Sequence, residues 1–162
     1  MGSNKNGWRS ACLQNVVERI MTNQGPETLN ILVCEYKTYN QEAIRRILES
    51  RGHCVTLTAS LNEALSTFLE RPQAYDLLLI DVIPPPPGAD SECKADLSWV
   101  PDVRAAQPSI GLLLASGYFG ERFQPPASST YLMKPFTSDE LAEAVAQAMR
   151  AAPAIMSLPK AA

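Results

Sequence analysis

The sequence predicts an α/β domain built on a doubly wound, five-stranded parallel sheet with helices on both faces. Short apolar runs alternate along the chain with helix-length segments, which is the pattern of parallel strands joined by crossover helices. The central runs are apolar at every position, as expected of strands that are buried on both faces. For a sheet of this kind the expected strand order is 2-1-3-4-5.

Five segments carry the strand pattern. Residues 30–34 and 110–114 are apolar runs suited to buried parallel strands, and residues 77–80 form another that ends at Asp81. Residues 54–58 are rich in β-branched side chains, which favour strands. Residues 131–133 are expected to form a short fifth strand.

Four segments between or after these runs have helical spacing. Residues 40–51 place three apolar side chains on one face and stop at Gly52. Ser60 and Glu63 form a capping box ahead of a second apolar stripe, and a helix within residues 95–106 is broken by Pro101 or begins there. Residues 137–140 form another capping box, which opens the last helix. The stripes of the second and last helices comprise Leu61, Ala64, Leu65, Phe68 and Leu69, and Leu141, Ala144, Val145, Ala148 and Met149.

The remaining segments are less regular. Residues 1–28 are an extension with one amphipathic helix over 11–23, residues 29–151 are the main domain, and residues 152–162 are a tail. Residues 119–130 hold prolines and hydroxyl side chains with almost no apolar periodicity, so the fourth helix of the sheet is degraded. The four prolines at 84–87 predict a stiff loop beside Asp81 or, alternatively, a docking ligand for an aromatic groove.

The composition argues against several classes of partner and ligand. The formal net charge of −3 gives no basic footprint for nucleic acid, and no apolar run is long enough to span a membrane. The four cysteines contain no C-x-x-C pair, so we expect reduced thiols and a cytoplasmic protein. No glycine-rich phosphate loop follows the first strand, which disfavours a flavodoxin-like enzyme or nucleotide binder.

Three charged residues follow three of the expected strands. In doubly wound sheets, functional residues lie just beyond the carboxyl ends of the strands. Glu35 follows the first strand, Asp81 ends the third and Lys134 follows the fifth. Isolated charges often cap strand ends, but a carboxylate pair with a cation also suits a divalent metal and a phosphoryl group.

The same residues lie in four fragments that resemble a response-regulator receiver domain of the chemotaxis-regulator type, a flavodoxin-like fold. The resemblance covers residues 29 to 151, and its most specific part is Lys134-Pro135-Phe136, where the family's lysine precedes a proline whose peptide bond is commonly cis. The four fragments are residues 30–35, 75–82, 108–118 and 131–136.

The resemblance implies a stand-alone receiver in a two-component phosphorelay. Asp81 would accept phosphate from a histidine kinase or a phosphotransfer protein, and Lys134 would pair with the aspartate and the phosphoryl oxygens. Signalling would pass to a downstream protein by contact, with a homodimer left open and no enzyme activity beyond autocatalytic transfer to Asp81. The implied magnesium ligands are Glu35, Asp81 and the backbone carbonyl of Ile83. Switching would involve Tyr131 and a hydroxyl at Ser116, or the position of Ala115.

Several departures from the family pattern favour an alternative. Tyr36 stands where a second acid is usual, which weakens the magnesium site, and Ala115 stands at the hydroxyl position unless Ser116 takes it. The degraded fourth helix also removes part of the usual output face. The alternative is therefore an atypical, degenerate pseudo-receiver that binds proteins without phosphorylation.

Overall fold

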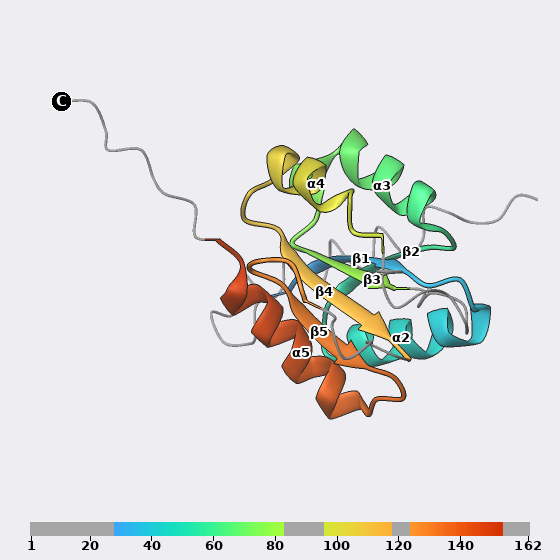
Figure 1. Cartoon of the computed structure of the whole chain (residues 1–162). Helices are drawn as coiled ribbons and strands as arrows, with labels where there is room; N and C mark the ends of the chain where they lie inside the picture. The colour runs from blue at the N-terminus through green and yellow to red at the C-terminus, as the bar shows by residue number, and fades with distance from the viewer. Residues whose placement is uncertain (1–27, 83–95, 118–123, 154–162) are drawn as a thin grey trace, which may run out of the picture.

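The computed structural model describes residues 28–82, 96–117 and 124–153, and the expected helix at 11–23, the prolines at 84–87, Ile83 and residues 154–162 lie outside them. Five parallel strands form one sheet in the order β2-β1-β3-β4-β5 (Figure 1), which confirms the predicted topology. The strands are β1 (Asn30–Cys34), β2 (Cys54–Thr58), β3 (Leu77–Asp81), β4 (Gly111–Ser116) and β5 (Thr130–Met133).

Four α-helices cover the two faces of this sheet in the described part of the chain, together with a short 3-10 turn. The α2 and α5 helices lie on one face and α3 and α4 on the other (Figure 1). The helices are α2 (Thr38–Ser50), α3 (Leu61–Glu70), α4 (Val100–Ala106) and α5 (Ser138–Ala151), and η1 (Pro72–Ala74) precedes β3. None of the described helices is long and apolar enough to cross a membrane.

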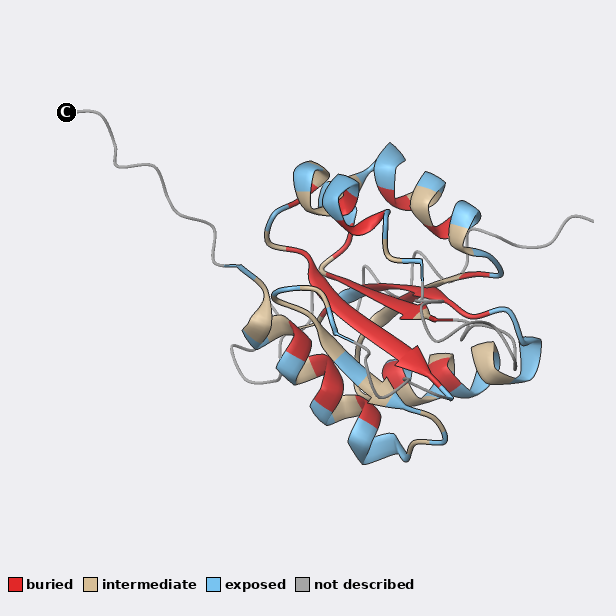
Figure 2. Cartoon of the chain, viewed as in Figure 1, coloured by how far each residue is buried: buried red, intermediate tan, exposed pale blue. Residues whose placement is uncertain are grey.

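The core consists of two apolar layers, one on each face of the sheet. Alternate residues of β3 point to opposite layers, with Leu77 and Leu79 toward α2 and α5 and Leu78 and Ile80 toward α3 and α4. All of β4 is buried (Figure 2). Burial on both faces explains why these strands read as continuous apolar runs.

Helix boundaries follow from local capping. The Ser60 hydroxyl accepts the Glu63 N–H at the start of α3, as predicted, but the Glu63 carboxylate accepts the N–H of Ala59 rather than that of Ser60. Thr137 and Glu140 form the complete capping box of α5. Pro101 lies in the first turn of α4, where its missing N–H costs nothing, so the helix begins there.

Three expectations need correction. Leu69 is 48% exposed, because it projects from the edge of the α3 stripe beyond Phe68. The α2 helix begins at Thr38, and β4 extends through Ser116 because it pairs with β5 to its end.

Cysteine chemistry differs between two positions. Cys34 is a free, buried thiol as expected, but Cys54 is disulfide-bonded, which corrects the expectation of reduced thiols. Cys54 begins the edge strand β2 and is only partly buried, so another segment can reach its sulfur. Cys54 therefore gives no support to the expected cytoplasmic location, which was inferred from reduced thiols.

Residues 124–129 contain no helix and are held by a side chain of α4. The guanidinium of Arg104 donates to the carbonyl of Ile110 before β4 and, over 2.6 Å, to that of Ser128 before β5. Arg104 thus ties the two loops that precede the neighbouring strands β4 and β5. Residues 119–123, the rest of the segment predicted to replace the fourth helix, lie outside the described residues.

Two leucines on helices provide a matched test of this packing. Leu48 on α2 is fully buried, whereas Leu69 on α3 is half exposed. We expect Leu48→Ala to lower the free energy of unfolding by about 2–5 kcal/mol, because it removes buried surface and leaves a cavity. Leu69→Ala should cost less than about 1 kcal/mol. Urea unfolding measures both values, and equal losses would contradict the assignment of Leu69 to the surface.

Candidate functional site

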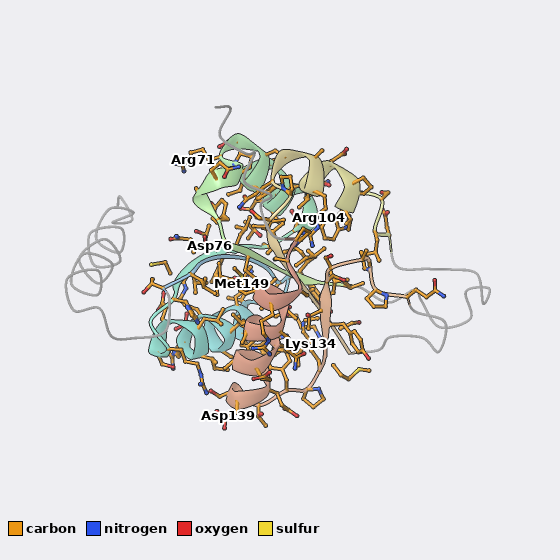
Figure 3. The ribbon with its side chains drawn as sticks, turned by 90° about the vertical axis from the view of Figure 1, so that its left-hand side faces the viewer. Arg71, Asp76, Arg104, Lys134, Asp139 and Met149 are labelled. Carbon is orange, nitrogen blue, oxygen red and sulfur yellow. The ribbon has the colours of Figure 1, made fainter. Side chains whose placement is uncertain are left out.

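The carboxyl ends of three strands bring Glu35, Asp81 and Lys134 together. The Lys134 Nζ lies 2.8 Å from Asp81 Oδ1 and 2.5 Å from Glu35 Oε2. Because β1 and β3 are adjacent, their terminal carboxylates meet at this edge of the sheet, and Lys134 reaches them from the end of β5. Figure 3 shows Lys134 in the lower half of the molecule, beside α5. The peptide between Lys134 and Pro135 is cis, as the resemblance implies.

Glu35 is the most enclosed member of this group. Its side chain is fully buried, whereas those of Asp81 and Lys134 are 7% and 18% exposed. The Lys37 N–H donates to Glu35 Oε1 over 2.9 Å, and the Gln41 amide donates to the Glu35 carbonyl. Each carboxylate oxygen of Glu35 therefore has its own donor, one from Lys37 and one from Lys134.

The surroundings raise the pKa of both Asp81 and Lys134 above their usual values. Burial raises the pKa of Asp81, Lys134 lowers it in part, and the Glu35 charge raises it further. Burial acts to lower the pKa of Lys134, but its hydrogen bonds to Asp81 and Glu35 outweigh that effect and raise it. Lys134 is therefore a fixed cation, while the ionised form of Asp81 is held at a cost.

The free thiol beneath Asp81 is not a second nucleophile. Burial, followed by the charge of Asp81, raises the pKa of Cys34 to about 11. A thiol becomes a good nucleophile only when its thiolate is populated, so Cys34 acts as a small apolar side chain at neutral pH.

Two cavities flank Asp81. The larger, of about 510 Å³, has a wall of apolar side chains from α2 and the β5–α5 loop, and its polar lining includes Lys37, Asp81 and Lys134. The smaller, of about 310 Å³, lies on the side of α3 and α4 and is lined by Cys34, Asp81 and Trp99 among others. Tyr36 lines both cavities, and it is 51% exposed.

The described side chains do not fit a magnesium site. No group of three histidine, cysteine, aspartate or glutamate side chains able to hold a metal occurs among the described residues. Magnesium requires near-octahedral oxygen coordination. Here Tyr36 supplies a ring instead of a carboxylate, and both Glu35 oxygens already accept hydrogen bonds. The carbonyl of Ile83, the third predicted ligand, belongs to a residue outside the described ranges.

The predicted switch residues lie on β4 and β5. Ala115 pairs with Asp81 in the sheet register, and Ser116 follows it as the last residue of β4. The Lys134 N–H donates to the Ser116 carbonyl over 2.8 Å, so Ser116 is the closer of the two to the lysine along the backbone. Tyr131 is half exposed on the edge strand β5.

Sequence reasoning missed two residues at the site. The side chain of Lys37 lies over the rings of Tyr36 and Tyr39, with its Nζ 5.4 and 6.0 Å from the ring centroids. Gln41 anchors the backbone at Glu35 from the first turn of α2. The only sequence signal for Lys37 was its position two residues after Glu35, just beyond the carboxyl end of the first strand.

Comparison with known proteins identifies the fold. The receiver domain of the hybrid histidine kinase CckA is 28% identical, with a TM-score of 0.56 over 74% of this chain and 98% of that one. A response regulator receiver protein from Sinorhizobium medicae is 24% identical, with a TM-score of 0.60 over 78% and 98%. A CheY-like receiver domain protein from Methanospirillum hungatei is 20% identical, with a TM-score of 0.60 over 76% and 95%. No protein-family model and no curated protein sequence matches the chain.

Removing Lys134 tests the ion-pair cluster. We expect Lys134→Met to lower the free energy of unfolding by about 3 kcal/mol, because it leaves the buried Glu35 carboxylate without its cation. Adding Glu35→Gln should restore part of that loss, since the amide needs no counter-charge. Urea unfolding of both single variants and the double variant measures the coupling, and strictly additive losses would contradict it.

The raised pKa of Asp81 predicts a pH-dependent stability. The folded state holds the Asp81 proton more tightly than the unfolded chain, so the stability due to this group is lost as pH rises from its unfolded pKa through the raised folded value. We expect Asp81→Asn to raise the free energy of unfolding at pH 7 by about 1 kcal/mol, as when a strained functional site is relieved. Below about pH 3.5, where aspartate becomes protonated, the free energies of unfolding of the wild type and Asp81→Asn should converge.

Asp96→Asn is the matched control. Ser98 lowers the pKa of the Asp96 carboxyl through two hydrogen bonds, so its contribution is present above the unfolded pKa and is lost as pH falls. This variant should therefore be less stable than the wild type at pH 7. Thermal unfolding across pH 3–7 compares the variants, and the same sign for both would refute the assignment.

Proposed function

We propose that this chain, which has the fold of a response regulator receiver domain, accepts a phosphoryl group on Asp81 and acts in two-component signalling. The observation that carries the proposal is the position of Asp81 at the carboxyl end of β3, within 2.8 Å of Lys134. The receiver fold of the solved structures supports the class of function.

Phosphoryl transfer to Asp81 needs no proton shuttle. A carboxylate oxygen of Asp81 attacks the donor phosphorus, an oxygen–phosphorus bond forms, and the bond to the donor breaks. With a phosphohistidine donor the nitrogen–phosphorus bond breaks and the imidazole leaves; with an acyl phosphate the carboxylate leaves. Catalysis of such transfers consists mainly of positioning and of stabilising charge on the equatorial oxygens.

Lys134 provides the positive charge for this step, and Glu35 holds the Lys134 ammonium in position. The ammonium of Lys134 touches Asp81 Oδ1, so it can stabilise the phosphoryl oxygens as they approach. Glu35 is fully buried and holds the same ammonium from the other side. Glu35 is therefore a positioning residue whose substitution acts through Lys134.

Ser116 and Tyr131 are the proposed responders. Ser116 ends β4, and its carbonyl accepts the backbone N–H of Lys134, so a backbone shift at Lys134 would reach Ser116 through one hydrogen bond. We assign the switching hydroxyl to Ser116 rather than to Ala115, because Ala115 has no side-chain donor. Tyr131 lies half exposed on the neighbouring strand and can change its orientation without unpacking the core.

The proposed partners follow from the same step. A histidine kinase or a phosphotransfer protein would supply the phosphoryl group, and a downstream protein or a second copy of the chain would read the altered surface. Nucleic acid is not proposed as a partner, because the net charge of −3 provides no basic footprint.

The second candidate is a pseudo-receiver that binds its partner without phosphorylation. Tyr36 and Ala115 favour it, because a tyrosine and an alanine stand at positions where the family pattern has an acid and a hydroxyl. In that case the Asp81–Lys134 pair would be structural only.

Phosphorylation of purified protein distinguishes the two candidates. We expect acetyl phosphate with Mg²⁺ to add one phosphoryl group to the wild type, visible on Phos-tag gels and by intact mass, and none to Asp81→Asn. Ser116→Ala should still be labelled but should lose the structural response. Failure of labelling with both acetyl phosphate and a phosphorylated histidine donor, together with partner binding unaltered by Asp81→Asn, would establish the pseudo-receiver.

A further inference from the structure

We propose that the Asp81 site works without a divalent cation, and that Lys37 supplies the second positive charge in its place. This inference rests on the proposed function and deepens it, because it specifies how the phosphoryl charge is balanced. Its metal-binding part can be tested separately from phosphorylation.

Both carboxylate oxygens of Glu35 already accept hydrogen bonds from other groups. One of its oxygens accepts the Lys134 ammonium over 2.5 Å and the other accepts the Lys37 N–H over 2.9 Å. A metal ion at Glu35 would have to displace one of these donors within a fully buried pocket. Displacing the Lys134 ammonium from Glu35 would leave it in contact with Asp81 alone.

The side chain that follows Glu35 is a tyrosine and not an acid. Tyr36 is 51% exposed and lines both cavities beside Asp81. A neutral phenol is a poor ligand for magnesium, which prefers carboxylates, carbonyls and water. Its ring does provide a face for a cation, and the Lys37 Nζ lies 5.4 Å from the ring centroid.

Lys37 lies beside the same cavity as Asp81. Lys37 and Lys134 both line the 510 Å³ cavity with Asp81. The Lys37 Nζ also lies 5.4 and 6.0 Å from the ring centroids of Tyr36 and Tyr39. Lys37 therefore faces the space that an incoming phosphoryl group would occupy.

The charges balance with two lysines. Glu35 and Asp81 carry two negative charges and Lys134 one positive charge, so the buried cluster alone has a net charge of −1. A dianionic phosphoryl group approaching Asp81 would be repelled by this cluster. Lys37 brings the cluster to neutrality at the mouth of the cavity, a role that a metal ion would otherwise serve.

The step is complete without a metal. An oxygen of the Asp81 carboxylate attacks the phosphorus of an acyl phosphate, the new oxygen–phosphorus bond forms, and the acyl carboxylate departs with the electrons of the broken bond. No proton and no electron transfer to a further reactant is required. Lys37 and Lys134 remain protonated throughout and act by charge alone.

Magnesium titration tests the first part directly. In isothermal titration calorimetry of the full chain with MgCl₂, we expect no saturable binding in the millimolar range for the wild type. Tyr36→Asp should create saturable binding in the same concentration range, because it adds a carboxylate beside Asp81. Saturable wild-type binding that is lost in Asp81→Asn would overturn the inference, whatever the outcome with Tyr36→Asp.

Labelling in EDTA tests the second part. We expect the rate of acetyl phosphate labelling, followed by intact mass, to be the same within about twofold in EDTA and in Mg²⁺ for the wild type. Lys37→Met should slow labelling by about three- to tenfold at low salt, with the effect fading as salt screens the charge. Loss of wild-type labelling in EDTA, or an unchanged rate in Lys37→Met, would overturn the assignment.

Arg71→Met is the matched control. Arg71 is an exposed cation after α3, and Figure 3 places it at the end of the molecule opposite Lys134. Its removal changes the net charge by the same amount as Lys37→Met and should leave the labelling rate unchanged.

The proposed function and this inference fail in different ways. If no condition labels Asp81, the proposed phosphorylation fails, and the magnesium titration still decides whether the site is metal-free. If labelling occurs only with Mg²⁺, the proposed function stands and this inference fails.

Discussion

The contact of one ammonium with two enclosed carboxylates is the interaction on which the rest of the site depends. Lys134 can hold Glu35 and Asp81 together only because β1 and β3 are neighbours and β5 ends at the same edge of the sheet. Burial makes the arrangement costly for each charge taken alone, and the cost is offset only while the three groups remain together. This mutual dependence explains why Glu35 influences Asp81 although no hydrogen bond joins them directly.

The sheet edge also determines what surrounds the cluster. The chain leaves β1 at Glu35 and enters α2 at Thr38, so Tyr36 and Lys37 must occupy the narrow turn between them. The Lys37 N–H is drawn inward to Glu35, while its side chain extends outward along the tyrosine rings. One residue thus contributes a backbone donor to the buried cluster and a charge to the cavity mouth.

The local patterns of the sequence predicted most of the fold, and the strand order brought the three charged residues together. Such patterns predict strands and helix starts well. A strand buried on both faces contains few polar residues, and a capping box can be recognised from four consecutive positions. Leu69 was misplaced because helical spacing alone does not define the width of the buried face. Cys54 and Lys37 were missed for another reason: their environments depend on segments that meet only in the folded chain.

The same cluster accounts for how a change at Asp81 would spread. A phosphoryl group on Asp81 would compete with Glu35 for Lys134, because the ammonium contacts both carboxylates in the unmodified site. The backbone N–H of Lys134 donates to the carbonyl of Ser116, at the junction of β4 with the edge strand β5. Residues on the other side of that junction are held separately by Arg104, whose hydrogen bonds reach the loops before both strands. Arg104 therefore ties the chain just before β5, and the backbone of Lys134 ties the chain just after it.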